Sequence, residues 1–310
     1  MPPNPHPLDY DWRFSNECVT KALNLLPTEG KIFSIGTPSL AFGIRSRGQH
    51  ITIVDRQELP EGIDHLQLDA NVMAEIRENF DCSIIDPPWY PEETVRWVSL
   101  GAASIKKHGQ IFLSIWPDET RPNAIMDKKE FLKWVKGWGD YDIIEGFFNY
   151  ETPKFEKEAL KAKQIDLKPS FRKGDLLKIT KNSTPDVPLP IIKKHLWHRF
   201  VIGEYQLALR VNECEEIPSI HKHPKANGWI WTSVSKRAIG RDQISLWDSN
   251  NKVAIVNGSN MILGELRRML GLATDGNSEA GAHEVLSKVL KEWEVPSLGP
   301  GRVREWHHLD

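Results

Sequence analysis

Five consecutive residues in the first third of the chain carry the clearest chemical signal: Asp86, Pro87, Pro88, Trp89 and Tyr90. The apolar residues before them predict a short buried strand, which the prolines end because proline cannot continue a strand ladder. A carboxylate, a rigid carbonyl and a flat ring then lie at a strand's carboxyl end, where open α/β sheets bind ligands. This set suits a planar amino group, whose hydrogens the oxygens accept while the ring packs on its face. A plain turn, with Asp86 as turn former and Trp89 in the core, fits the same residues.

A second set of candidate residues lies upstream, around two predicted strands at 31–35 and 50–54. The first strand runs into a tight loop at Gly36, and the second ends at Asp55, 19 residues later. Nucleotide-binding βαβ units place an acid on the ribose hydroxyls at this spacing, because a carboxylate at the tip of the adjacent strand can accept from both. The usual G-x-G-x-x-G pattern is absent, so the spacing carries the prediction. A third strand ends at Asp69, which fits either an adenine amino group or a helix cap.

The order of the predicted elements indicates the fold class. Strands alternate with helices up to about residue 150 and are followed by a strand-rich stretch. This order predicts an α/β fold, a Rossmann-like, doubly wound and mostly parallel sheet with an antiparallel edge. The further helices are expected at 16–26, 75–80, 92–107 and 131–138, and the further strands at 65–70, 109–116, 141–148, 174–179, 199–203 and 206–211.

Three domains are predicted from these elements. Residues 1–30 form an N-terminal lid or helix, residues 31–212 the doubly wound domain, and residues 213–310 a small α+β appendage for a substrate or partner. In the first of these, Asp11, Trp12 and Arg13 fit either a lid on a ligand or a staple on the helix. The appendage is expected to contain a linker at 217–224, strands at 229–233 and 253–256, and helices at 262–270 and 285–293.

Composition is that of an ordinary globular protein, with 310 residues, 40% hydrophobic residues and a formal net charge of −2. No apolar run approaches the ~20 residues that span a bilayer, and the start does not read as a signal peptide. Three scattered cysteines fit neither a disulfide framework nor a metal site, so we expect a cytoplasmic protein without a metal. The net charge argues against a globally basic nucleic-acid binder. Residues 151–200 nevertheless hold twelve Lys/Arg against six Asp/Glu, which fits a phosphate backbone or a solvated face.

Together these motifs resemble the class I S-adenosylmethionine-dependent methyltransferases that carry the [D/N]-PP-[aromatic] signature of amino-nitrogen methylation. The glycine loop precedes Asp86-Pro87-Pro88-Trp89, unlike the RNA adenine methyltransferases in which this tetrapeptide comes first. With Pro38 where a second glycine is usual, the loop is closer to two other groups, the zinc-knuckle ribosomal-RNA adenine methyltransferases and the elongation-factor lysine methyltransferases. The resemblance covers roughly residues 8–212, and the chain has no Cys/His knuckle.

The resemblance implies a role for each matching residue. S-adenosylmethionine would be the cofactor, and its site would comprise Gly36, Thr37, Pro38, Ser39, Asp55, Arg56, Asp69 and Ala70. Of these, the residues after Gly36 would enclose the methionine and ribose, Asp55 would hold the ribose hydroxyls, and Asp69 with Ala70 would flank the adenine. The catalytic corner would be Asp86, Pro87, Pro88 and Trp89, with Trp89 and Tyr90 stacking on the substrate.

The predicted function is S-adenosylmethionine-dependent N-methylation of an amino nitrogen, with adenine N6 in RNA or DNA as the leading target. The stacking ring of Trp89 and the basic stretch favour a nucleic acid over a lysine, which has no face to stack. A protein lysine or a small amine is the alternative substrate. A catalytically silent methyltransferase-like subunit that binds a partner through residues 213–310 is the third hypothesis.

Overall fold

A computed structural model of the chain describes residues 3–9, 12–57, 59, 62–74, 76, 80–166, 172–191, 195–212, 217–233, 235–273, 280–296 and 303–309. The chain folds into two compact units. One, the parallel-sheet unit, comprises residues 12–152 and 169–192. The other, the antiparallel unit, comprises residues 1–11, 153–168 and 193–310.

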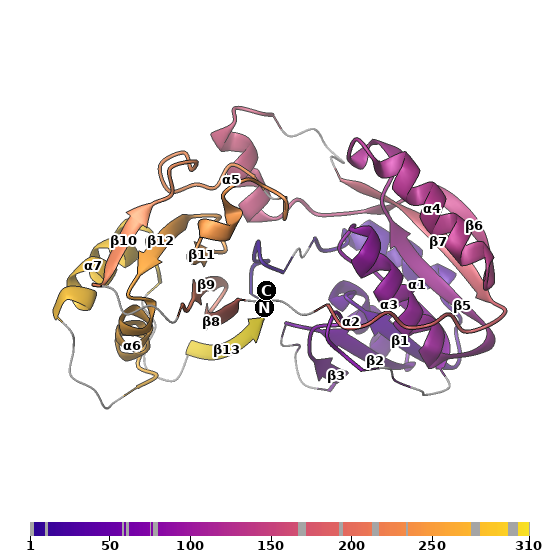
Figure 1. Cartoon of the computed structure of the whole chain (residues 1–310). Helices are drawn as coiled ribbons and strands as arrows, with labels where there is room; N and C mark the ends of the chain where they lie inside the picture. Colours follow the sequence, from indigo (N-terminus) through magenta and orange to yellow (C-terminus); the bar gives the residue numbers. More distant parts are fainter. Residues whose placement is uncertain are drawn as a thin grey trace. The chain divides into compact units, whose positions relative to one another are not determined.

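The parallel-sheet unit contains a seven-stranded sheet in the order β3-β2-β1-β4-β5-β7-β6 (Figure 1). The first five strands of this order pair in parallel, and β7 is antiparallel to both of its neighbours. This confirms the predicted Rossmann-like, doubly wound and mostly parallel sheet with an antiparallel edge. In chain order its elements are α1 (Asn16–Leu25), β1 (Lys31–Ile35), α2 (Pro38–Ser46), β2 (His50–Asp55), β3 (Asp64–Gln67), β4 (Phe80–Ile85), α3 (Pro91–Ser104), β5 (Ile105–Ile115), η1 (Asp118–Thr120), α4 (Ala124–Lys136), β6 (Gly139–Asn149) and β7 (Lys173–Lys181).

Helices cover both faces of this sheet, which explains why its central strands are almost wholly apolar. Successive side chains of a strand point to opposite faces. Thus Ile32 of β1 packs in the cluster that contains residues of α1 and α2, whereas Phe33 packs in the cluster that contains residues of α3 and α4. On β4, Ile84 and Ile85 divide between the two clusters in the same way. The residues predicted at 75–80 as a helical piece lie partly outside the described residues, and Phe80 begins β4.

The direction in which the chain winds reverses between β1 and β4. From β1 the chain proceeds to β2 and β3 on one side, and β4 and β5 lie on the other. Ile35 of β1 is in register with Ile85 of β4, so both strands end at one level. The backbone N–H of Asp86 continues the pairing by donating to the Ile35 carbonyl at 3.0 Å. Ligands of open α/β sheets bind at such a reversal, outside the carboxyl ends of the strands.

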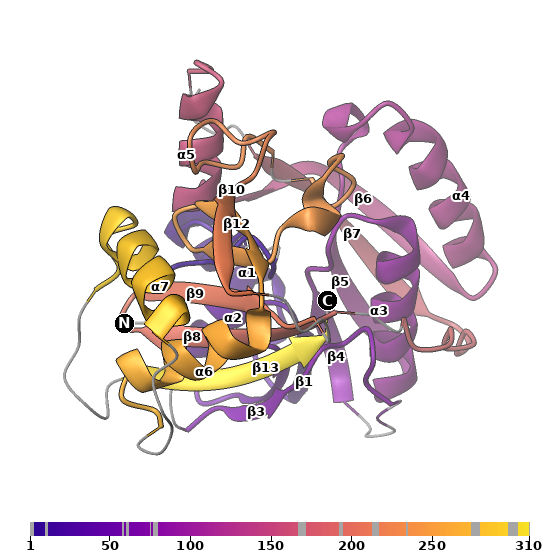
Figure 2. The same cartoon turned by 60° about the vertical axis from the view of Figure 1, so that its left-hand side comes forward.

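The antiparallel unit contains a six-stranded sheet in the order β10-β12-β11-β9-β8-β13, with β13 along β8 (Figure 2). Residues of α6 and α7 pack on one face, and Leu8 and Trp231 pack on the other. The elements are α5 (Lys154–Ala162), β8 (Leu196–Ile202), β9 (Tyr205–Arg210), β10 (Ser219–Lys222), η2 (Arg241–Gln243), β11 (Leu246–Asp248), β12 (Val253–Asn257), α6 (Ser259–Met269), α7 (Ala280–Glu292) and β13 (Val303–Leu309).

This division of the chain differs from the predicted ranges 1–30, 31–212 and 213–310. Strand β9 pairs with β8 on one side and with β11 on the other, in both cases antiparallel. Both β8 and β9 therefore belong to the sheet of the antiparallel unit. The predicted linker at 217–224 contains β10. No strand forms at 229–233, although these residues are described; there Ile230 makes only isolated bridges, to Asn227 and Lys252. None of the helices among the described residues is both long and apolar enough to cross a membrane.

Replacing Gly36 should destabilise the parallel-sheet unit. Its φ is +69°, and a Cβ there would lie 2.6 Å from the Trp97 ring and 2.8 Å from the Asp86 carbonyl oxygen. The left-handed backbone alone costs an L-residue about 1–2 kcal/mol, and the overpacking adds about 1–3 kcal/mol. Gly48→Ala is the matched control, since Gly48 has φ +75° and nothing within 4 Å of its Cβ position. Urea unfolding should show a larger loss for Gly36→Ala; equal losses would contradict the clash.

Ionisation of Asp248 should make stability depend on pH. Asp248 is fully buried, and burial raises its pKa to about 7 against the opposing bonds from Tyr205 Oη and the Lys252 backbone N–H. Because the pKa is higher in the folded state, the folded chain binds the extra proton, and stability falls as pH rises from about 4 to about 7, by at most about 1.4 kcal/mol per pH unit. Asp248→Asn should remove this slope in urea unfolding between pH 5 and 7.5. Parallel profiles for both proteins would refute the assignment.

Candidate active site

The Asp86 corner joins β4 to α3 through its two prolines. Pro87 is buried, whereas Asp86 and Trp89 are half-buried. The Tyr90 backbone N–H donates to the Pro88 carbonyl at 2.6 Å, and Tyr90 is the N-cap residue of α3. The corner is therefore a rigid turn, as one of the two sequence interpretations held. Its acid nevertheless reaches a partner far away in the chain, which a turn former does not need to do.

That partner is Tyr150, which follows directly on β6. Its hydroxyl donates to Asp86 Oδ1 at 2.7 Å and also shares a short hydrogen bond with Ser114 Oγ. Tyr150 is buried, and burial together with the negative charge of Asp86 raises the pKa of its phenol well above the usual value of 10.0. The phenol therefore stays a neutral donor over the working pH range. A carboxylate has about four acceptor sites, so the bond from Tyr150 orients Asp86 and uses one of them.

Trp89 is held in place by two contacts to its ring and one hydrogen bond to its backbone carbonyl. Tyr150 meets it edge to face, with centroids 5.6 Å apart and an interplanar angle of 83°. A Cβ on Gly174 of β7 would lie 3.0 Å from the indole, so β7 packs tightly against the Trp89 ring at this glycine. Arg121 Nη1 donates to the Trp89 carbonyl at 2.8 Å, and the same arginine pairs with Asp127. The plane of Trp89 is therefore fixed next to the Asp86 carboxylate.

The segment before α1 also reaches this corner. The guanidinium of Arg172 lies 4.0 Å from the centre of the Trp12 ring and 6.0 Å from that of Trp89. Arg13 donates from Nη2 to Gln57 Oε1 at 3.3 Å, and Ser15 caps α1 by accepting from the Cys18 N–H. Asp11, the third residue of the predicted lid or staple, lies outside the described residues.

The Gly36 loop lies at the same edge, next to the Asp86 corner. The Gly36 backbone N–H donates to the Val54 carbonyl at 3.0 Å, and the positive φ of Gly36 turns the chain directly into α2. Thr37 is buried, with its hydroxyl 2.5 Å from Ser34 Oγ, and Pro38 is the first residue of α2. Ser39 follows in the first turn. The amino end of α2, with its first backbone N–H groups, therefore lies at the carboxyl end of β1.

The other predicted cofactor residues lie at the ends of β2 and β3. Asp55 is half-buried, and its Oδ1 accepts from the Gln57 N–H at 2.8 Å. Arg56 lies across from Asp69, with Nη1 3.6 Å from Oδ2, and Ala70 is buried.

Asp69 stabilises a turn rather than capping a helix, since no helix begins among the described residues between β3 and β4. Its Oδ1 accepts from the Asn71 N–H at 2.8 Å, and its carbonyl accepts from the Met73 N–H. Asn71 in turn accepts from Trp97 Nε1 at 2.9 Å, which ties this turn to α3. The Trp97 ring also lies next to Gly36, as the clash of a Cβ at Gly36 with this ring shows. Trp97 therefore connects the turn after β3 with the Gly36 loop.

The sequence did not indicate four residues of this corner: Ser114, Arg121, Tyr150 and Arg172. For two of them a signal existed. Tyr150 lies just past the predicted strand at 141–148, and Arg172 lies just before the predicted strand at 174–179. Residues at the ends of strands can face a ligand at the edge of a sheet. The sequence did not indicate that these two strands reach the sheet edge at which Asp86 lies.

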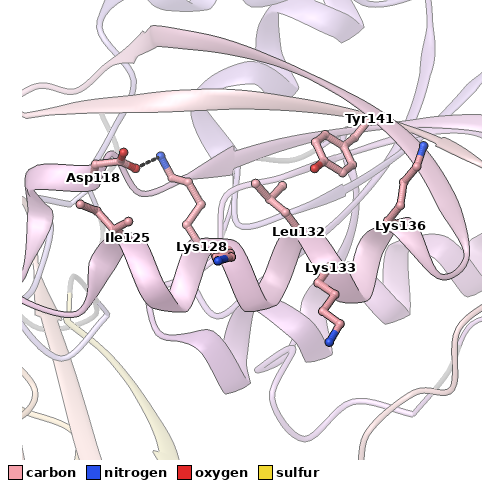
Figure 3. A pocket seen from close by; sticks show the side chains of 8 residues that line it. Asp118, Ile125, Lys128, Leu132, Lys133, Lys136 and Tyr141 are labelled. Carbon is pink, nitrogen blue, oxygen red and sulfur yellow. Dashed lines mark ion pairs between the residues drawn. The ribbon is translucent and has the colours of Figure 1, made fainter.

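A separate groove of about 430 Å³ lies between α4 and β6 (Figure 3). Leu132 and Tyr141 lie side by side in it, and Lys128 reaches up to Asp118 at 2.6 Å. Lys128 also pairs at 2.9 Å with Asp175, which follows the glycine that packs on Trp89. The positive charge of Lys128 is thus neutralised by two carboxylates, and its ion pair with Asp175 links α4 to β7.

Comparison with solved structures finds chains with a similar fold. The branched-chain polyamine synthase of Thermus thermophilus, in complex with N4-aminopropylspermidine and 5′-methylthioadenosine, matches with a TM-score of 0.52 and 13% identity over 62% of this chain and 64% of its own. The 16S rRNA N2 methyltransferase of the same organism, in complex with AdoMet and guanosine, matches with a TM-score of 0.35 and 10% identity over 63% and 46%. The match to the synthase supports a Rossmann-like fold.

These similarities cover only a part of each chain. A TehB-like SAM-dependent methyltransferase of Corynebacterium glutamicum matches with a TM-score of 0.36 and 10% identity, over 53% of this chain and 86% of its own. The chain spans somewhat less than two-thirds of the length of the polyamine synthase. No protein-family model and no curated protein matches the sequence.

Tyr150→Phe should destabilise the parallel-sheet unit by about 1–3 kcal/mol, because Ser114 Oγ is left buried without its partner and Asp86 loses a donor. Tyr141→Phe on β6, the strand that Tyr150 follows, is the control, since Tyr141 is only half-buried. Urea denaturation of both variants measures the difference. If Tyr150→Phe unfolds with the midpoint of wild type, the Tyr150 hydroxyl does not hold the corner together.

Proposed function

We propose that the chain is an S-adenosylmethionine-dependent N-methyltransferase whose target is an exocyclic amino group, adenine N6 in RNA or DNA. The observation that carries this proposal is the position of Asp86 and Trp89 beside the Gly36 loop. An acceptor for amino hydrogens and a stacking ring thus lie next to a glycine turn at the reversal of the sheet. Class I methyltransferases use this edge for cofactor and substrate together, as the motif resemblance implies.

The residues at this edge fit the cofactor. Gly36 has no side chain and a positive φ, and the amino end of α2 begins two residues later. Asp55 is half-buried at the end of the adjacent strand, where a carboxylate can accept from both ribose hydroxyls. Asp69 and Ala70 lie past the next strand, where they would flank the adenine. When bound, S-adenosylmethionine supplies an electrophilic methyl group on its sulfonium.

The chain's own contribution is to orient the amine. An exocyclic adenine nitrogen is a weak nucleophile, because its lone pair is delocalised into the ring. Asp86 and the Pro87 carbonyl would accept its two hydrogens and favour a pyramidal nitrogen, while Trp89 holds the plane of the base. Such positioning can be worth up to about 7–11 kcal/mol, with electrostatic complementarity added. No strong base is required, since the proton can leave after methyl transfer, and a paired base has to be flipped out first.

The charges around Trp89 favour a base over an ammonium group. The charge of Arg121 is offset by its ion pair with Asp127, whereas the guanidinium of Arg172 lies 6.0 Å from the centre of the Trp89 ring. A cation at this distance repels a protonated lysine or polyamine and attracts a phosphate. The polyamine in the synthase structure keeps a small amine as the second candidate substrate, and a lysine remains the alternative among proteins. A silent subunit is the least favoured candidate, because both Asp55 and Asp86 are present in the sequence.

The deciding experiment is incubation with radiolabelled S-adenosylmethionine and separate pools of RNA, DNA, protein and small amines. The proposal expects label in N6-methyladenine after digestion of a nucleic-acid pool. Label in lysine or in a free amine would replace it with the alternative. Calorimetry with S-adenosylmethionine belongs beside it, since no heat at high cofactor concentration would identify a silent subunit.

Asp86→Ala should strongly reduce methyl transfer and leave cofactor binding nearly intact. Removal of one preorganised electrostatic group of this kind costs about 10²–10³ in kcat. Asp55→Ala should do the reverse, with a raised Kd for S-adenosylmethionine in calorimetry. Asp142→Ala on the exposed part of β6 is the matched control and should leave both unchanged. Wild-type turnover in Asp86→Ala would remove Asp86 from the mechanism.

A further inference from the structure

We propose that the groove between α4 and β6 is a docking site for an acidic amphipathic helix of a partner protein. Apolar side chains form the floor of this groove, lysines line it, and its length suits about three turns of a helix. The residues that line the groove are not those of the Asp86 corner. The inference therefore goes beyond the proposed methyl transfer and does not rest on it.

The floor of the groove is apolar and reaches the solvent. Leu132 of α4 and Tyr141 of β6 lie side by side in it, and both are half-buried (Figure 3). Ile125, in the first turn of α4, lies at one end and is 63% exposed. Ile143 follows two residues after Tyr141, so it points to the same face of the sheet, and it is 38% exposed. These side chains leave an apolar strip that a partner can cover.

The spacing of the α4 residues indicates the length and form of the occupant. Four lining residues follow one another at intervals of four, three and four positions and so form one stripe along the helix: Ile125, Lys129, Leu132 and Lys136. From the first to the last of them the helix rises by about 16 Å, which is the length of three helical turns. A second helix laid along this stripe can present its own apolar residues at the same intervals.

The charges of the groove favour an acidic occupant. Lys128 has two carboxylate partners, as described above, and Lys136 pairs with Asp140. Lys129 and Lys133 are exposed, and neither ammonium group forms an ion pair or hydrogen bond with any other residue that the structure describes. These two lysines lie four positions apart on α4, so two carboxylates at the same spacing on a facing helix can pair with them.

The combination of floor and charge disfavours two other kinds of occupant. The lysines would attract the sugar-phosphate backbone of a nucleic acid, but that backbone cannot cover the aliphatic side chains of Ile125 and Ile143. A second copy of this chain, bound groove to groove about a two-fold axis, would bring the lysines of one α4 against those of the other. Like charges at such a contact repel. A helix with both carboxylates and apolar residues satisfies both features of the groove.

The test is fluorescence anisotropy of the full chain with a fluorescein-labelled synthetic peptide of about 14 residues. The peptide is built from Leu, Ala and Glu, with leucines at i, i+3, i+4 and i+7. A second peptide has Lys in place of every Glu and is otherwise identical. The chain should bind the Glu peptide and not the Lys peptide. The double variant Lys129→Glu/Lys133→Glu should bind the Glu peptide about ten-fold more weakly and gain affinity for the Lys peptide.

Two further variants separate the apolar contact from the charge. Ile125→Ser should weaken binding of the Glu peptide about ten-fold and leave its salt dependence unchanged, because only apolar contact is lost. Lys157→Glu/Lys161→Glu is the matched control, since these lysines are exposed at the same spacing on α5, in the antiparallel unit. This control should bind the Glu peptide as wild type does. All of these side chains are exposed, so each variant should melt like wild type.

Failure of the Glu peptide to bind, or equal binding of the two peptides, would overturn the docking site. So would unchanged affinity in Lys129→Glu/Lys133→Glu. A single-stranded RNA whose binding is weakened in this double variant but not in Ile125→Ser would identify a nucleic acid as the occupant and overturn the proposal. Dimerisation of wild type that Ile125→Ser abolishes, measured by sedimentation, would do the same in favour of a second copy.

Discussion

The pairing of β1 with β4 is the constraint on which the rest of the parallel-sheet unit depends. Ile35 and Ile85 end their strands at the same level, and the Asp86 N–H still donates to the β1 carbonyl. The loops that follow must therefore share one small volume. Gly36 solves the crowding by having no side chain where Trp97 and the Asp86 carbonyl approach. The Gly36 loop and the Asp86 corner can lie this close together only because of this fit.

The antiparallel edge of the sheet supplies the other half of the corner. The pairing of β6 with β7 shifts register between Ile144 and Phe148, and Gly146 within this bulge has φ +58°. Its N–H donates to Asp175 Oδ1 at 2.8 Å, which fixes the bend. The strand then ends with Tyr150 against Asp86, although β5 and β7 lie between β6 and β4 in the sheet. A bulge thus re-aims one side chain toward the site, as bulges near active sites commonly do.

These two halves differ in how far the sequence could predict them. Parallel strands present their carboxyl ends to one edge, so apolar runs ending at Gly36, Asp55 and Asp86 sufficed to place those residues together. The strand after 141 was also predicted, but not its bulge, because a register shift has no signature in a pattern of period two. Periodicity likewise predicts strands at 199–203 and 206–211, but it does not predict which sheet they join. That choice depends on long-range pairing, here with β11 and β13.

The neutral state of Tyr150 explains how the corner can hold both an acid and a nearby cation. If the phenol ionised, two negative charges would face each other at 2.7 Å in a buried place. Burial and the charge of Asp86 both raise the pKa of the phenol, so its proton stays and donates to the carboxylate. The dipole of the Tyr150 hydroxyl then stabilises the negative charge of Asp86. A carboxylate held in this way remains a hydrogen-bond acceptor, as the proposed function requires of Asp86.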